Sequence, residues 1–366
     1  MLWWIANSFA LDIPMPTPAQ GFETVKLTVG GFVQPRFTRI PSDSDAATSG
    51  TIGFSVRRVR LENTVSFQAQ QGVDLTSKIS LELMPEARLV DAYIDAGMHS
   101  LFNIRFGQQK SGSNRSLMIS DKQTLFPERG ALQELVPRRE MGLTVHGLTD
   151  SGWIAYSLGV FNGEGTNRLA NVNRKMMGVG RVVLSPIGSP GTTTELMNPD
   201  DPTTVSLGYA FHINQVGPEG QQEGTYGHNA EAFAHWKWMT LQAEYLYRNI
   251  DWEDTSIADY TQGGWYVQLG SFVPGTAWTQ QHLALLLRVE EIDEFEAINS
   301  TIPLVGPTDP AQRRRNLSVG FGLYAGKPWF AQAQDLRIQL VYTNRSELEN
   351  LTYDDDEVTI AAHLTF

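Results

Sequence analysis

Residues 358–366 read Val-Thr-Ile-Ala-Ala-His-Leu-Thr-Phe and end the chain. Apolar side chains stand at every second position of this stretch, from Val358 to Phe366. A period of two is typical of a β-strand whose two faces meet different surroundings. The stretch therefore predicts an amphipathic strand at the C-terminus, and the same alternation recurs along the rest of the chain.

A chain that ends on a strand with a terminal aromatic residue resembles the assembly signal of bacterial outer-membrane β-barrels. Sixteen segments alternate in this way, each about 9–15 residues long and able to cross a membrane as a tilted strand. An even number of strands places both termini on one side, as a single-chain bacterial barrel requires. The predicted fold is an all-β, 16-stranded antiparallel transmembrane β-barrel. The predicted strands are 25–38, 54–68, 73–84, 88–98, 101–110, 141–149, 153–162, 177–186, 203–213, 229–239, 241–250, 263–273, 282–292, 313–325, 336–345 and 357–366.

The two faces of these segments differ as the wall of a barrel in lipid demands. In one of them, Leu317, Val319 and Phe321 alternate with the polar Asn316 and Ser318. The apolar face would meet lipid, and the polar face would line the lumen. A soluble sandwich would show the same alternation with its polar face outside, so periodicity alone does not separate the two folds.

The connections separate them, because most odd-numbered ones are long and most even-numbered ones are short turns. Long loops on one side and short turns on the other are typical of outer-membrane barrels. Two connections break this rule: the odd one at 84–87 is short, and the even one at 187–202 is long. The long odd connections are 39–52, 111–140, 163–176, 214–228, 251–262, 293–312 and 346–356.

The chain has 366 residues, no cysteine and a formal net charge of −12. The lack of cysteine excludes disulfide scaffolds and thiolate sites, and the acidic balance argues against a nucleic-acid partner. No run of about 18 apolar residues occurs, which excludes a transmembrane helix. The charge is uneven, because residues 1–183 carry 19 Lys and Arg against 16 Asp and Glu, whereas residues 184–366 carry 9 against 24.

The first ten residues are apolar and end in Ser8-Phe9-Ala10, which fits a small-x-small cleavage site. They lack the positively charged start of a complete signal peptide. Residues 1–10 are therefore interpreted as a signal-peptide remnant or as an ordinary apolar segment. Residues 11–366 are expected to form a single outer-membrane barrel without a domain boundary.

Five motifs of the first half occur in a characteristic order and spacing. They are Phe54-Ser-Val-Arg57-Arg58-Val-Arg60-Leu61, Leu89-Val-Asp91-Ala-Tyr93, Ile104-Arg105-Phe-Gly107-Gln-Gln-Lys110, Val136-Pro-Arg138-Arg139-Glu-Met-Gly142 and Tyr156-Ser-Leu-Gly-Val-Phe161-Asn-Gly163. Together they resemble the phosphate-selective porin O and P family, whereas the second half matches it mainly in strand rhythm. The resemblance implies a 16-stranded barrel, commonly a trimer, whose third long loop folds inward to narrow the pore. That loop would be 111–140, with a helix-prone stretch at 125–135.

The resemblance also implies a constriction lined by basic side chains that pass anions. Fixed positive charges replace part of the hydration of an anion, and low-dielectric walls focus their field. Each of these side chains could instead be paired with a neighbouring carboxylate, and Arg57 is expected to face away or to sit at a bulge. The predicted pore-lining and anion-binding residues are Arg36, Arg58, Arg60, Arg105, Lys110, Arg115, Lys122, Arg129, Arg138 and Arg139.

Strong phosphate selectivity is disfavoured by the charge of the same region. Residues 113–140 carry five basic and four acidic side chains, so the loop is nearly neutral. Glu62, Asp91 and Asp95 are expected to face the lumen as well. We therefore expect an outer-membrane porin for passive diffusion of small hydrophilic solutes, with a mild preference for anions.

The expected partners are outer-membrane lipid, lipopolysaccharide, small anions and further copies of the chain in a homotrimer. No catalytic residue, cofactor or metal ion is expected, because zinc-protease, nucleophile-elbow, phosphate-loop and dinucleotide motifs do not occur. The acidic runs 290–294 and 354–357 are expected to be solvated charge in external loops. Two alternatives stay open: a structural or adhesive outer-membrane barrel, and a soluble β-rich glycosidase that uses carboxylates such as Asp91 and Asp95.

Overall fold

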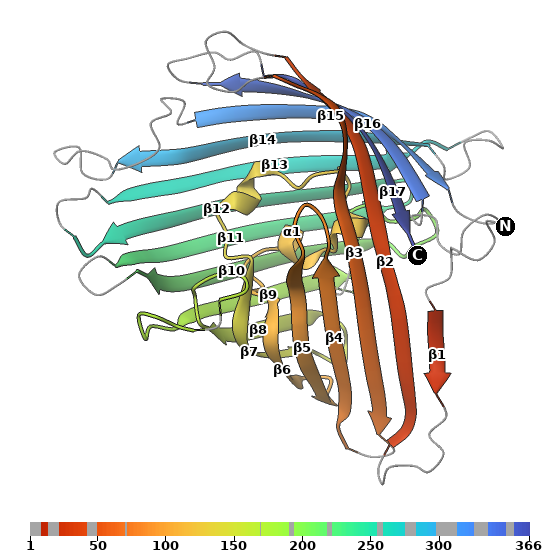
Figure 1. Cartoon of the computed structure of the whole chain (residues 1–366), viewed down its shortest axis with the longest axis vertical. Coiled ribbons are helices and arrows are strands. Elements are labelled where there is room, and N and C mark those ends of the chain that lie inside the picture. Colours follow the sequence, from red (N-terminus) through yellow and green to blue (C-terminus); the bar gives the residue numbers. More distant parts are fainter. Residues whose placement is uncertain are drawn as a thin grey trace.

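The structure is a computed structural model of the chain, shown in Figure 1. The described part is nearly all β-strand and has three short helices: α1 (Arg115–Met118), η1 (Asp121–Gln123) and η2 (Ala131–Glu134). No helix in that part is long and apolar enough to cross a membrane. The structure describes residues 9–13, 22–41, 50–69, 72–168, 170–189, 194–217, 222–254, 259–274, 283–297, 313–325, 336–348 and 355–366.

The strands follow one another around a single sheet, and Figure 1 labels them in chain order. Their bounds are β1 (Phe9–Ile13), β2 (Phe22–Ile40), β3 (Thr51–Ala69), β4 (Asp74–Glu82), β5 (Arg88–His99), β6 (Phe102–Lys110), β7 (Arg139–Leu148), β8 (Ile154–Phe161), β9 (Met177–Ile187), β10 (Thr204–Val216), β11 (Glu223–Trp236), β12 (Met239–Trp252), β13 (Tyr260–Phe272), β14 (Leu283–Ala297), β15 (Arg313–Ala325), β16 (Leu336–Glu347) and β17 (Glu357–Thr365).

Strands β2 to β17 form a closed barrel. Each pairs antiparallel with the next, and β17 pairs with β2 to close the ring (Figure 1). Every predicted segment coincides with one of these strands, so the predicted 16-stranded antiparallel barrel is confirmed. Strand β1 was not predicted; it pairs with Val25–Val29 of β2, whereas β17 pairs with the stretch from Phe32 to Arg39. Strand β1 therefore prolongs the seam where β17 ends.

The last residue of the chain is fixed at this seam. The Phe366 backbone N–H donates to the Gly31 carbonyl over 3.0 Å, and the Gly31 N–H donates to the Phe366 carbonyl over 2.8 Å. A Cβ on Gly31 would lie 2.2 Å from the Arg60 carbonyl oxygen and 3.0 Å from the Phe366 ring. Only glycine fits here, and the predicted amphipathic C-terminal strand is β17.

The wall of the barrel is apolar outside and polar inside. In β12, Leu241, Tyr245 and Tyr247 are exposed on the outer face, whereas Gln242 and Glu244 are buried on the inner face. A continuous band of exposed apolar side chains is the surface that lipid covers in a membrane barrel. The polar face therefore lines the lumen, as the alternation predicted.

Two local expectations were wrong. The acidic run 290–294 is not in a loop but inside β14. The expectation failed because Glu291 interrupts the apolar outer face of the strand and so hides the alternation there. Arg313 and Arg315 form ion pairs with Glu291. The helix-prone stretch 125–135 forms only the four-residue helix η2, because Pro127 and Gly130 interrupt a longer helix.

The N-terminal prediction stays largely untested. Residues 1–8 of the predicted signal remnant lie outside the described residues, and Phe9 and Ala10 begin β1.

Candidate pore constriction

The connection between β6 and β7, residues 111–138, crosses the interior of the barrel, and we call it the inner segment. Figure 1 shows α1, which belongs to it, within the ring of strands. Its residues bond to inward-facing side chains of β2 and β3, and also to those of β12, β14 and β16. The inner segment is therefore attached along one arc of the wall, which runs from β12 through β16 and across the seam to β2 and β3.

Buried glutamates hold three backbone N–H groups of the inner segment. Ser116 N donates to Glu244 over 2.7 Å, and Leu125 N donates to Glu195 over 2.6 Å. Ala131 N donates to Glu290 over 2.9 Å. A buried N–H without an acceptor costs about 1–3 kcal/mol, so each glutamate fixes the path of the segment at one point.

Cationic side chains hold carbonyl groups of the same segment. Lys110 Nζ donates to the carbonyl oxygens of Met118 and Ile119, both over 2.9 Å. Arg288 donates to the Glu128 carbonyl oxygen over 3.1 Å. Lys110 is thus an internal tether of the loop base and not a free charge in the lumen.

Apolar side chains fill the space between the inner segment and strands β12 to β16. One cluster surrounds Leu125 and Phe126, and a second surrounds Leu132 and Leu135. On the wall, the first consists of Phe272, Ala284, Leu286, Tyr324 and Val341, and the second of Leu246, Tyr266 and Ile292. This side of the barrel, which we call the closed side, is packed like a protein core.

Three arginines of β2 and β3 converge on Glu128 of the inner segment. The distances from Arg36, Arg57 and Arg58 to its carboxylate are 3.2, 2.6 and 2.9 Å. A register shift between β2 and β3 beside Arg57 turns both Arg57 and Arg58 inward. Of the two alternatives expected for Arg57, facing away or sitting at a bulge, the structure has the bulge, which adds an arginine that the predicted pore-lining set did not contain.

A second network fixes the start of the segment. Arg60 contacts Glu82 and Asp121, each over 2.5 Å, and Arg129 contacts Asp121 over 3.0 Å. These groups are almost fully buried, and Arg60 is only 4% exposed. Two positive and two negative charges cancel, so Arg60 and Arg129 act as anchors of the inner segment in this structure.

The carboxyl groups of the inner segment are held in their ionised form. Burial raises the pKa of Asp121, but the charges of Arg129 and Arg60 outweigh it and hold that pKa well below its usual range. Burial also raises the pKa of Glu128, but the charges of Arg58 and Arg57 outweigh it, so that this pKa is lowered as well.

These shifts predict how the pore responds to acid. A carboxyl with a depressed pKa stabilises the fold above its unfolded pKa of about 4, and this contribution is lost only as the pH falls through the lower folded value. We expect these two anchors to hold between pH 7 and pH 5 and to weaken only below about pH 4, where single-channel currents should become noisier. Single-channel recording from pH 5 down to pH 2 checks it, and currents that stay equally steady over this range would contradict the anchoring role of Asp121 and Glu128.

On the opposite side, from β4 to β8, many inward-facing polar side chains are only half-buried, and we call this the open side. Arg105 contacts Asp95 over 2.8 Å and stacks over the Tyr93 ring at 4.6 Å. Arg139 contacts Asp91 over 2.8 Å. Cations here alternate with carboxylates, and the side chain of Arg105 keeps a quarter of its surface exposed.

Two lysines and one arginine complete the open side. Lys122 and Lys78 contact Glu62 at 2.9 and 3.5 Å. Arg138, which ends the inner segment, is exposed, and its guanidinium has no carboxylate partner in the described part of the chain.

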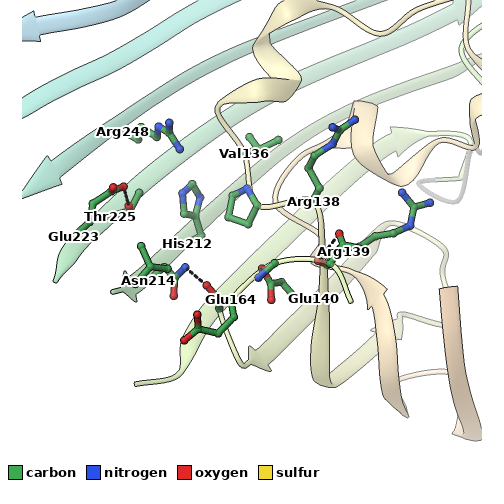
Figure 2. A pocket seen from close by; sticks show the side chains of 15 residues that line it. Val136, Arg138, Arg139, Glu140, Glu164, His212, Asn214, Glu223, Thr225 and Arg248 are labelled. Carbon is green, nitrogen blue, oxygen red and sulfur yellow. Dashed lines mark hydrogen bonds between the residues drawn. The ribbon is translucent and has the colours of Figure 1, made fainter. Parts of the chain in front are cut away.

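A cavity of about 390 Å³ lies between the end of the inner segment, the 162–176 connection and strands β10 to β12 (Figure 2). Its lining is mixed in charge, with the carboxylates of Glu140, Glu164 and Glu223 and the guanidinium groups of Arg138, Arg139 and Arg248. Figure 2 shows the Arg139 side chain pointing away from Glu140 and Glu164. The cavity continues the solvent-filled lumen.

The predicted pore-lining residues thus fall into two sets. Arg36, Arg58, Arg60, Lys110, Arg115 and Arg129 hold or support the inner segment, and Arg115 does so by stacking over the Phe233 ring at 3.8 Å. Arg105, Lys122, Arg138 and Arg139 face the open side. The prediction omitted Arg57, Lys78, Arg248 and Arg288, and also Arg337 of β16, which donates to the Thr124 carbonyl oxygen of the inner segment.

The described residues contain no group of three or more histidines and carboxylates that could hold a metal ion.

A closed antiparallel barrel with an apolar outer wall and a polar, partly obstructed lumen defines an outer-membrane porin. The chain belongs to the phosphate-selective porin O and P family, whose model matches residues 27–210, half of the chain. It is a bacterial outer-membrane channel protein for diffusion, and this family consists of channels and not of enzymes. No curated protein sequence matches the chain.

Solved porin structures share the fold at low sequence identity. The outer-membrane channel DcaP of Acinetobacter baumannii is 12% identical with a TM-score of 0.66, and the alignment covers 93% of this chain and 97% of that one. OmpT of Vibrio cholerae, solved in a trimer form, is 11% identical with a TM-score of 0.62 over 93% and 99%. OmpF of Salmonella typhi, solved in complex with daunomycin, is 10% identical with a TM-score of 0.61 over 93% and 98%.

Proposed function

We propose that the pore prefers small anions mildly and that they pass along the open side, between the inner segment and strands β4 to β8. The apolar clusters of the closed side leave the open side as the wet route through the barrel. A polar wall with fixed charges can replace part of the hydration of a passing ion.

An unpaired cation on the open side carries this proposal. Lys78, Lys122, Arg105 and Arg139 are paired with Glu62, Asp95 and Asp91, whereas the exposed Arg138 has no carboxylate partner within the described residues. The cavity beyond adds Glu140, Glu164 and Glu223 against Arg248, so it is the unpaired Arg138 in a low-dielectric passage, and not a net excess of positive charge, that favours anions. The neighbouring carboxylates weaken the field, so the preference is mild and phosphate is one of several permeant anions.

The same barrel is proposed to work as a homotrimer in contact with lipopolysaccharide. The trimer form of the OmpT structure and the family resemblance support this assembly.

Reconstitution in a planar lipid bilayer tests both proposals. In a potassium chloride gradient the reversal potential should have the sign of chloride preference, and the current should rise in groups of three equal steps. A potential of the opposite sign would contradict the anion preference, and single isolated steps would contradict the trimer. A barrel that inserts without conducting would instead support the structural alternative.

A further inference from the structure

We propose that residues 194–198, in the long connection between β9 and β10, form a clasp that holds the middle of the inner segment from the opposite end of the barrel. In this proposal Glu195 is a positioning residue of the constriction. Even-numbered connections are otherwise mostly short turns, and this one is the long exception. The clasp accounts for its length. The proposal needs a conducting pore but is independent of its ion preference.

The clasp bonds to the backbone of the inner segment in both directions. Glu195 N donates to the Gln123 carbonyl oxygen over 3.0 Å, and Leu125 N donates to the Glu195 carboxylate over 2.6 Å. Thr194 Oγ1 also lies 3.5 Å from the Gln123 carbonyl oxygen. One residue of the clasp thus satisfies both a carbonyl and an N–H of the segment.

The clasp is also packed into the closed side. Leu196 is 1% exposed and shares a cluster with Leu125 and Phe126. A Cβ on Gly270 of β13 would lie 2.6 Å from Leu125 Cδ1 and 2.9 Å from Leu196 Cδ1. The absence of a side chain at Gly270 makes room for the clasp and the inner segment at the same point of the wall.

The barrel wall itself ties down the other end of the clasp. Met197 N donates to Thr240 Oγ1 of β12 over 3.2 Å. Asn198 N donates to the Asp201 carboxylate over 2.7 Å, which closes a turn before β10 begins. The clasp is therefore held at both ends, by the inner segment and by β12.

The point of attachment explains the function. Gln123 and Leu125 lie between Asp121 and Glu128, the two carboxylates that the arginines of β2 and β3 hold. Those ion pairs fix the segment through its side chains, and Glu195 fixes the backbone between them. Without Glu195, the Leu125 N–H loses its acceptor in a dry site, and this part of the segment gains freedom to move into the passage.

Replacing Glu195 with alanine tests the positioning role in single-channel recordings. We expect brief closures to become about tenfold more frequent, because the buried Leu125 N–H then lacks an acceptor and no longer holds the segment in place. Glu195→Gln keeps an acceptor oxygen and should restore most of the quiet current. Glu86→Ala, an exposed carboxylate removed from another connection, is the matched control and should behave as the parent protein. A Glu195→Ala channel as quiet as this control would overturn the proposal, provided that gel mobility shows a folded barrel.

A cross-link tests the contact independently of conduction. The chain has no cysteine, so Leu125→Cys combined with Leu196→Cys supplies the only two thiols. With a short bifunctional thiol reagent present during refolding, so that it reaches both thiols before the closed side packs, the two should be joined, whereas Leu125→Cys with Val172→Cys, an exposed position on another connection, should stay unlinked. If only the control pair, or neither pair, is linked while all thiols react after denaturation, the clasp does not lie where we propose.

Discussion

Replacing Arg60 with alanine is expected to destabilise the protein by about 3–5 kcal/mol, because it removes the shared partner of two buried carboxylates. Glu82 and Asp121 each contact Arg60 over 2.5 Å, and Glu82 is only 1% exposed. After the change, Arg129 still contacts Asp121, but the buried Glu82 loses its arginine partner. Equilibrium unfolding by urea in detergent measures the loss, and single-channel recording should show an unsteady current at the same time.

A second variant separates the buried charge from the loss of the arginine side chain. Arg60→Ala combined with Glu82→Gln removes the uncompensated charge and should recover a large part of the free energy of unfolding. Arg174→Ala, at an exposed position, should leave it unchanged. If Arg60→Ala is as stable as Arg174→Ala, the buried network does not anchor the inner segment.

Replacing Arg138 with glutamate is expected to change the ion preference more than any other single substitution. This side chain is exposed on the open side and, within the described residues, lacks a carboxylate partner, so its charge is less compensated than those of the paired Arg105 and Arg139. A unit charge at about 4 Å in water is worth about 1 kcal/mol, which is about fivefold in relative permeability for each unit of charge changed. The reversal potential in a potassium chloride gradient measures the shift, which should be toward potassium.

The matched control carries the same change in charge away from the passage. Arg174→Glu alters an exposed arginine in the 162–176 connection and should shift the reversal potential little. Equal shifts in the two variants would mean that Arg138 acts through the general field of the protein and not as part of the passage wall.

The strands could be predicted from the sequence because each of them repeats one local pattern. In β15, Leu317, Val319 and Phe321 face outward in the structure as the alternation required. The closure of the barrel followed from the even number of strands and the terminal Phe366. The short strand β1 was not predicted, because five residues, 9–13, are too few to show a period of two.

The site was harder to predict because its contacts depend on the path of the inner segment through space. The alternation along the strand correctly predicted that Arg58 and Arg60 face inward, but it could not show that the inner segment lies over them. The same alternation on β14 and β16 places Arg288 and Arg337 at inward-facing positions, and both could have been added to the predicted pore-lining residues. The register shift at Arg57 and the acceptor roles of Glu195 and Glu244 have no local signature.

The central claim, that ions pass on the open side and that the closed side is dry, can be tested with two single cysteines in this cysteine-free chain. Ser157→Cys places a thiol on the inner face of β8 on the open side, and Ser318→Cys places one on β15, where Ser318 is 0% exposed. Both changes replace one atom. During recording in a planar bilayer, a water-soluble, negatively charged thiol reagent should react at Ser157→Cys and lower the current, and it should leave Ser318→Cys unaffected. Rapid loss of current with Ser318→Cys and none with Ser157→Cys would contradict the account.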